Sequence, residues 1–190
     1  NIVNVCISIL YGIFLLMTKK KQMEVAVLLH DIRSTHNVGS IFRTSDALGV
    51  NKIYLSGYTP SPIDKYGRAR KDIGKVALGA EKTISWEYEE DPKRIIKSLI
   101  KEGFQVVCVE QDEKSVDYKK LKVKEKVLFV MGNEVLGVDK KILELCDDVV
   151  EIPMKGEKES LNVSVAYGVA LFRIMGIYYS KVSTILPILS

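Results

Sequence analysis

The chain is poor in the residues from which disulfide frameworks and zinc sites are built. Its 190 residues include three cysteines and two histidines, and no CxxC pair or histidine-rich segment accompanies them. The cysteines, Cys6, Cys108 and Cys146, are widely spaced and odd in number, which does not favour a disulfide framework. Two histidines are too few for a histidine-based metal cluster. We therefore expect a reducing, cytoplasmic setting and no metal centre.

Common nucleotide-binding fingerprints are also missing. Neither GxGxxG nor GKS/T occurs, and residues 24–180 contain no internal repeat, low-complexity tract or evident linker. The absence argues against a doubly wound nucleotide-binding enzyme of the usual kind. The charge has no strong sign, because 28 lysines and arginines face 24 acidic residues for a net +4. Such a balance does not by itself indicate a nucleic-acid partner, whereas the length is that of one domain with a real core.

The only long hydrophobic run is at the start, in residues 1–17, and the basic residues of 18–21 follow it. Its length is at the lower limit of about 17 to 25 residues that cross a bilayer, and Asn4 and Ser8 interrupt it. It lacks the basic start and the cleavage site of a signal peptide. Residues 1–22 are thus a membrane anchor, which we do not favour, or a dispensable or non-native extension. We expect one domain over 23–180 and an apolar tail over 181–190.

The rest of the chain alternates between strand and helix patterns. Six short segments rich in β-branched residues predict strands at 24–29, 52–56, 82–88, 104–110, 126–131 and 148–154. Helical patterns lie at 37–49, 91–103, 138–146 and 162–181, with Asn37 and Asp91 as expected N-caps. This alternation predicts an α/β fold with a mainly parallel six-stranded sheet and flanking helices. Ligands are then expected at the carboxyl ends of the strands.

Three polar segments follow the first, fifth and sixth predicted strands. Taken singly, each has a simpler interpretation. Asn37 is typical of a helix cap, Arg43 of a surface arginine, and Gly132 to Gly137 of a tight turn. Only their occurrence together, at ends of strands in one sheet, indicates a site.

The order and spacing of these segments resemble the SpoU (TrmH) family of RNA ribose 2'-O-methyltransferases, in the SPOUT superfamily. The resemblance covers roughly residues 24–178. Its three motifs are Asn37-x-Gly39 with Phe42-Arg43-Thr44, then Phe129 through Gly137, then Ile152-Pro153-Met154 with Ser160-Leu161-Asn162-Val163-Ser164. It implies a C-terminal trefoil knot, S-adenosylmethionine as the methyl donor, and a homodimer.

Under this resemblance the glycine-flanked turn binds the cofactor. Glycines let the backbone approach a flat ligand closely, and exposed amides and carbonyls then recognise it. The expected cofactor-binding residues are Leu128, Met131, Gly132, Asn133, Gly137, Ile152, Met154, Leu161 and Val163.

The resemblance assigns the central catalytic role to Arg43. Because a guanidinium stays protonated in proteins, we expect it to clamp an RNA phosphate and not to act as a base. Glu134 is expected to orient Arg43, while Asn37, Ser160 and Asn162 hold the ribose and phosphate. A non-catalytic RNA-binding protein of the same fold remains the alternative.

A basic segment at 64–75 provides an expected RNA surface. Its RNA-binding candidates are Arg68, Arg70, Lys71 and Lys75, with Tyr58 and Tyr66 available for stacking. About two dozen residues precede the first predicted strand, so we expect the core to select its substrate and favour tRNA over rRNA.

The last predicted helix, 162–181, is apolar on every side and so needs cover on every side. A second subunit or the apolar ends of the chain provide that cover. We expect the second subunit, and hence a two-fold homodimer.

Overall fold

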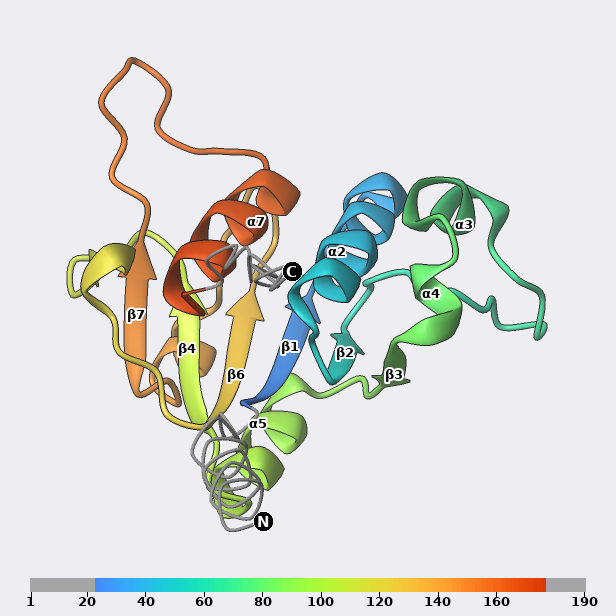
Figure 1. Cartoon of the computed structure of the whole chain (residues 1–190), viewed down its shortest axis with the longest axis horizontal. Helices are drawn as coiled ribbons and strands as arrows, with labels where there is room; N and C mark the ends of the chain where they lie inside the picture. Colours follow the sequence, from blue (N-terminus) through green and yellow to red (C-terminus); the bar gives the residue numbers. More distant parts are fainter. Residues whose placement is uncertain (1–22, 177–190) are drawn as a thin grey trace, which may run out of the picture.

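The computed structural model describes residues 23–176, and the seven strands among them form one parallel sheet (Figure 1). The strands are β1 (Glu24–His30), β2 (Lys52–Ser56), β3 (Ser85–Tyr88), β4 (Gln105–Val109), β5 (Val116–Asp117), β6 (Lys126–Met131) and β7 (Asp148–Glu151). Their order across the sheet is β3-β2-β1-β6-β4-β7-β5, and every neighbouring pair is parallel. The predicted α/β class and parallel sheet are confirmed. The expectations for residues 1–22 and 177–190 lie outside the described residues.

The predicted count of six strands is wrong, because the two-residue strand β5 adds a seventh at the edge beside β7. A strand this short leaves no alternating pattern to detect. The prediction of a strand from residue 82 is also wrong. Ala80–Thr83 forms the short helix α4, and the strand begins at Ser85. Gly79, with φ of 100°, turns the chain into α4, and its N–H donates to Glu81 at 3.0 Å.

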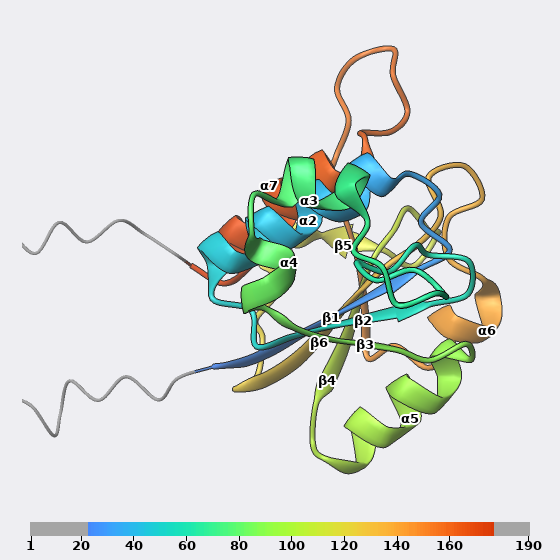
Figure 2. The ribbon, with the colours of Figure 1, turned by 90° about the vertical axis from the view of Figure 1, so that its right-hand side faces the viewer.

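Helices cover both faces of the sheet. The helical elements are α2 (Thr35–Leu48), α3 (Lys71–Ala77), α4, α5 (Pro92–Lys101), the 3-10 turn η1 (Tyr118–Lys120), α6 (Lys140–Leu143) and α7 (Val163–Ile174). α2, α3, α4 and α7 lie on one face, and α5 and α6 on the other (Figure 2). The central strands are therefore buried on both faces. In β6, Val127 and Phe129 belong to one core, and Leu128 and Val130 to the other.

The helix caps agree with the sequence at most positions. Asp91 caps α5, with Pro92 following it, and Gly49 ends α2 in the left-handed conformation. Asn37 is not the cap of α2. Ser34 is the N-cap, and its side chain accepts a hydrogen bond from the Asn37 N–H at 3.3 Å. The helix therefore begins earlier than predicted, and the side chain of Asn37 remains available for other contacts.

α2 and α7 pack against each other on the same face of the sheet (Figure 1). Ser45 and Tyr167, both fully buried, share a hydrogen bond of 2.6 Å between their hydroxyl groups. Burial raises the pKa of Tyr167, although Ser45 opposes this shift, so the phenol stays protonated. This contact fixes the two helices whose N-termini approach the site described below.

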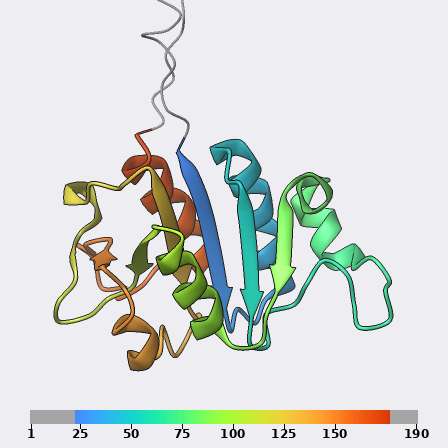
Figure 3. The same ribbon diagram turned by 90° about the horizontal axis from the view of Figure 1, so that it is seen from below.

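Two segments project beyond the sheet. Residues 153–162, between β7 and α7, rise above its carboxyl edge (Figure 1). Residues 57–70, between β2 and α3, extend outward past β3 (Figure 3). Within residues 23–176, no helix is long and apolar enough to cross a membrane.

Candidate active site

The turn after β6 is a closed loop in which both glycines are sterically required. The Asn133 and Gly137 backbones exchange two hydrogen bonds, of 3.1 and 3.0 Å. A Cβ at Gly132 would lie 2.4 Å from Val138 Cγ2 and 2.7 Å from the Gly137 carbonyl oxygen. Gly137 has φ of 68°, a conformation that favours glycine.

Glu110, just after the carboxyl end of β4, holds this turn by a hydrogen bond to its backbone. Its carboxylate accepts a hydrogen bond of 3.0 Å from the Val138 N–H and one of 2.8 Å from the Gln111 N–H. A Cβ at Gly137 would lie 2.6 Å from the same carboxylate. Glu110 and Gln111 were not predicted as residues of the site. Their position at the end of a predicted strand was the signal that could have identified them.

Glu134, at the tip of the turn, is bonded to the start of α2. Its carboxylate accepts hydrogen bonds from the N–H groups of Arg33, at 3.0 Å, and Ser34, at 3.3 Å. It also accepts one from Asn37 Nδ2 at 2.9 Å. Burial by itself would raise the pKa of Glu134, but these donors outweigh it and hold the pKa below its usual value. Glu134 is therefore an anion held at a helix N-terminus.

Asn37 extends this network to the third motif. Its side-chain oxygen accepts a hydrogen bond of 3.1 Å from Asn162 Nδ2. Asn162 is the N-cap of α7, since its own oxygen accepts from the Ser164 N–H at 3.0 Å. Glu134, Asn37 and Asn162 thus form one hydrogen-bonded chain that joins all three sequence motifs. Asn162 serves as a helix cap and as a site residue at once.

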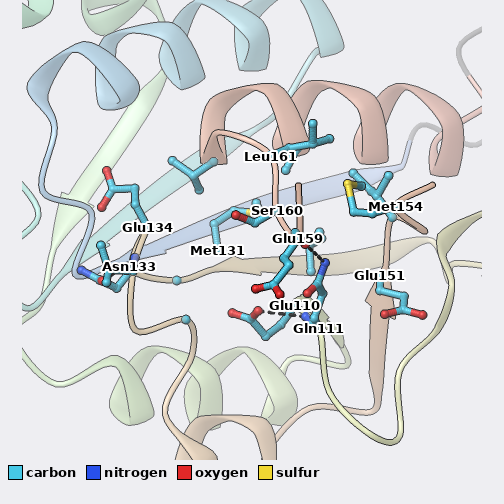
Figure 4. A pocket seen from close by; sticks show the side chains of 17 residues that line it. Glu110, Gln111, Met131, Asn133, Glu134, Glu151, Met154, Glu159, Ser160 and Leu161 are labelled. Atoms are coloured by element: carbon cyan, nitrogen blue, oxygen red, sulfur yellow. Dashed lines mark hydrogen bonds between the residues drawn. The ribbon is translucent and has the colours of Figure 1, made fainter. Parts of the chain in front are cut away.

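A cavity of about 280 Å³ opens beside the hydrogen-bonded residues Glu134, Asn37 and Asn162 (Figure 4). Its lining contains eight of the nine predicted cofactor-binding residues, together with Glu134 and Ser160. The eight are Met131, Gly132, Asn133, Gly137, Ile152, Met154, Leu161 and Val163. The remaining one, Leu128, is fully buried and packs in the core on the α5 side. It does not line the cavity, because it lies three residues before the end of β6 and faces away from α7.

The charged residues around the cavity are all acidic. Its lining includes Glu110, Glu134, Glu151 and Glu159, and no lysine or arginine. Gln111 closes one side, where its amide donates to the Glu159 carbonyl at 2.6 Å (Figure 4). Apolar side chains, including Met154 and Leu161, line the side beneath α7. The cavity therefore suits a ligand with an apolar part and a positive charge.

Arg43 lies farther along α2 and does not line the cavity. Its side chain is exposed, and within residues 23–176 it makes no hydrogen bond or ion pair. The expectation that Glu134 orients Arg43 is wrong. The carboxylate of Glu134 is instead bonded to Asn37 and the backbone before α2. Arg43 is left free to contact a ligand outside the cavity.

The basic segment lies on the opposite side of α2 from α7. Arg68 forms an ion pair of 2.9 Å with Asp64, and Arg70 one of 3.6 Å with Asp72. Lys71 and Lys75 are exposed on α3. Arg68, Arg70 and Lys71 line a second cavity, which Lys75 does not reach.

Comparison with known proteins identifies the family. The model of the SpoU rRNA Methylase family matches residues 24–172, nearly all of the described chain. The chain belongs to the SpoU methylase family. Within that family, it is 32% identical over 154 residues to the tRNA (guanosine(18)-2'-O)-methyltransferase of Aquifex aeolicus (strain VF5), matching 81% of this chain and 70% of the relative. It is also 32% identical to the 23S rRNA (guanosine-2'-O-)-methyltransferase RlmB of Vibrio vulnificus (strain CMCP6), over 80% of this chain and 59% of the relative.

Solved structures of SpoU enzymes share the fold. The A. aeolicus TrmH/SpoU tRNA modifying enzyme matches with a TM-score of 0.71 and 29% identity, over 83% of this chain and 76% of that one. An AdoMet-bound rRNA methyltransferase from Sinorhizobium meliloti matches with a TM-score of 0.73 and 28% identity, over 82% and 57%. The chain thus spans little more than half the length of some of its relatives.

Proposed function

We propose that this protein transfers a methyl group from S-adenosylmethionine to a ribose 2'-hydroxyl group in RNA. The observation that carries the proposal is the hydrogen-bonded chain of Glu134, Asn37 and Asn162 at the rim of the cavity. It brings together polar groups from three distant segments, beside a cavity suited to a cationic donor. Membership of the SpoU family supports the same reaction, since relatives in it are named RNA 2'-O-methyltransferases.

The lining residues fit the donor. The turn from Gly132 to Gly137 can close in this conformation only because neither glycine carries a Cβ, and its backbone is the expected contact for the adenine. Met154, Leu161 and the other apolar residues would enclose the remainder, and the four glutamates favour its positive charge. S-Adenosylmethionine, when bound, supplies the electrophilic methyl group.

Residues at the rim of the cavity and beyond it would hold the RNA. A ribose hydroxyl is a weak nucleophile and must be aligned and deprotonated. Ser160 and Asn162 present short polar groups for the ribose and phosphate, and the buried Asn37, bonded to Glu134 and Asn162, positions Asn162. Arg43, exposed and without a partner among the described residues, would bind the adjacent phosphate through two N–H donors. The guanidinium offsets the negative charge of the phosphate and so lowers the pKa of the hydroxyl group, and a phosphate oxygen accepts the released proton and passes it to water.

Methyl transfer to RNA tests the proposal directly. We expect the purified chain to transfer labelled methyl groups from the donor to ribose in small RNA. Arg43→Ala should abolish transfer while the donor affinity, measured by calorimetry, stays within about threefold of the unchanged chain. Arg94→Ala is the matched control, because Arg94 is also exposed on a helix but on the opposite face of the sheet. Label on a base would refute the ribose assignment. RNA binding without any transfer would favour the non-catalytic alternative.

The substrate preference and the setting belong to the proposal as well. We expect tRNA to be methylated faster than rRNA, although relatives of both kinds are similar to this chain. Parallel assays with tRNA and rRNA from the same cells decide between them. A cytoplasmic location and a knotted C-terminal region are likewise proposed, on the basis of the family.

A homodimer is proposed from the surface of α7. Val165, Val169 and Phe172 are 49%, 41% and 41% exposed, so one side of this helix has no cover within residues 23–176. Gly168 lies between them and permits close approach of another helix. Light scattering on the full chain should give about twice its mass of 21.4 kDa, and Val169→Glu should shift it toward one chain. A monomer at micromolar concentration would refute the dimer.

A further inference from the structure

A second cavity, of about 710 Å³, lies on the segment that leaves β2, and we call it the tyrosine cavity. Its lining consists of Gly57, Tyr58, Thr59, Pro60, Ser61, Asp64, Lys65, Tyr66, Arg68, Ala69, Arg70, Lys71 and Tyr88. Its residues Arg68, Arg70 and Lys71 belong to the basic segment predicted from the sequence as a surface for RNA. The structure shows in addition a concave site with three tyrosines, formed by the segment that projects past β3 in Figures 1 and 3 and by Tyr88 at the end of β3.

Two of these tyrosines are fixed by hydrogen bonds of their hydroxyl groups, while about half of each residue's surface remains exposed to solvent. Tyr88 donates a hydrogen bond of 2.6 Å to the Gly57 carbonyl, and its residue is 48% exposed. Tyr58 accepts one of 2.5 Å from Asn133 Nδ2, and its residue is 56% exposed. Within residues 23–176, no cation lies over either ring, whereas Lys65 and Arg68 lie over Tyr66. Tyr58 and Tyr88 are thus preorganised surfaces for stacking.

The charge of the tyrosine cavity is opposite to that of the donor cavity. Four cations and one carboxylate line it, and the carboxylate, Asp64, is already paired with Arg68. Lys71 makes no hydrogen bond or ion pair within the described residues. Cations beside open aromatic rings are the combination that binds a nucleotide, through its phosphate and its base.

The two cavities share a structural link. Asn133 lines the donor cavity, and its side-chain amide donates both to Tyr58, in the tyrosine cavity, and to the Asp31 carbonyl at 2.9 Å. A nucleotide in the tyrosine cavity would therefore lie next to the donor turn. In a duplex the faces of a base are covered by its neighbours, so only an unpaired or extruded base can stack on Tyr58 and Tyr88.

We propose that the tyrosine cavity binds one unpaired nucleotide of RNA, with its base on Tyr58 and Tyr88 and its phosphate on Lys71. This inference rests on the proposed function and makes it narrower, because it restricts the substrate to RNA whose target region is single-stranded or opened.

Binding of a short fluorescent RNA to the full chain, with S-adenosylmethionine present, tests the site. We expect a single-stranded 12-mer to bind more tightly than the same sequence in a duplex. Tyr88→Ala should weaken single-strand binding by about five- to a hundredfold, the range for loss of one stacked base. Tyr88→Phe keeps the ring and should bind within about threefold of the unchanged chain. Lys71→Ala should also weaken single-strand binding, whereas Lys101→Ala, on α5 across the sheet, should not.

The outcomes separate this inference from the proposed function. Methyl transfer to RNA together with unchanged single-strand binding by Tyr58→Ala and Tyr88→Ala would overturn the nucleotide site alone. Equal affinity for duplex and single strand would overturn it too. No donor binding and no methyl transfer by the unchanged chain would instead refute the proposed function, while ring-dependent RNA binding would still support the site. Thermal unfolding of each variant checks that these half-exposed positions tolerate the change.

Discussion

Replacement of Glu134 by Gln tests whether its carboxylate holds the donor turn against α2. The carboxylate accepts three hydrogen bonds, from Arg33 N, Ser34 N and Asn37 Nδ2. The glutamine side chain is neutral and keeps one oxygen as acceptor. At least one of the three hydrogen bonds is therefore lost, and the remaining ones no longer have a charged acceptor. A hydrogen bond to a charged group contributes about 1.5–3 kcal/mol, so we expect a loss of about 2 kcal/mol in the free energy of unfolding. For a domain of this size, that loss lowers Tm by about 4–8 °C.

The loss of stability caused by Glu134→Gln should depend on pH, in a direction set by the pKa of Glu134. Because the pKa of Glu134 is lower in the folded than in the unfolded chain, its contribution is fully present above the unfolded value of 4.5. It is lost as the pH falls through the lower, folded pKa. Glutamine does not titrate, so the difference in stability between Glu134→Gln and the unchanged chain should shrink below that pH. Urea unfolding at pH 7 and at several acidic pH values measures it.

Glu151→Gln is the matched control for this experiment. Glu151 lines the same cavity, but within the described residues its carboxylate accepts no hydrogen bond. Its replacement removes the same charge and should leave Tm within about 1 °C. Two results would refute the reasoning: equal losses for both variants, or a Glu134→Gln difference that stays constant as the pH falls.

Two further substitutions test the packing around the site. Gly132→Ala should weaken donor binding at least tenfold and destabilise the fold by about 1–3 kcal/mol, because its Cβ would overlap Val138 and the Gly137 backbone. Gly156→Ala, with open space around the new Cβ, is the control, and calorimetry that finds both variants alike would contradict the close packing. Tyr167→Phe should cost about 1–3 kcal/mol by leaving the buried Ser45 hydroxyl unpaired. Adding Ser45→Ala should restore most of that loss in urea unfolding, and a further loss of similar size would refute the pairing.

The sequence predicts the sheet well because each central strand is buried on both faces. Such strands are continuous apolar runs, as in 127–131, and this pattern can be recognised without knowing the neighbouring strands. The edge is less predictable. β5 has two residues and is defined only by its pairing with β7, and α4 extends into the segment 82–88 that was predicted as a strand. These features depend on tertiary contacts that no local pattern contains.

The sequence predicted most of the residues that line the cavity, but it predicted less well which residues contact one another. The glycine-flanked turn and the apolar residues near it line the cavity as expected. The face of the sheet to which each side chain points was not predicted. Leu128 was assigned to the cavity, but it points to the other face of β6, toward α5. Arg43 was wrongly predicted as the partner of Glu134. The N-cap of α2 is Ser34, which precedes the motif, so the side chain of Asn37 is free to donate a hydrogen bond to Glu134. A capping residue is identified by backbone geometry, which composition does not give.

The hydrogen-bonded chain at the site also determines when the protein becomes competent during its synthesis. Asn37 is separated from Glu134 by 97 positions in the sequence and from Asn162 by 125. Because a ribosome adds about 5–20 residues per second, Asn162 follows Asn37 by about 6–25 seconds. Throughout that interval the start of α2 and the first strands exist without the groups that complete the network. Contacts this distant also slow folding once the chain is complete. The methyl donor can therefore act as a late ligand, which binds only after the last helix has docked and then favours the finished fold by mass action.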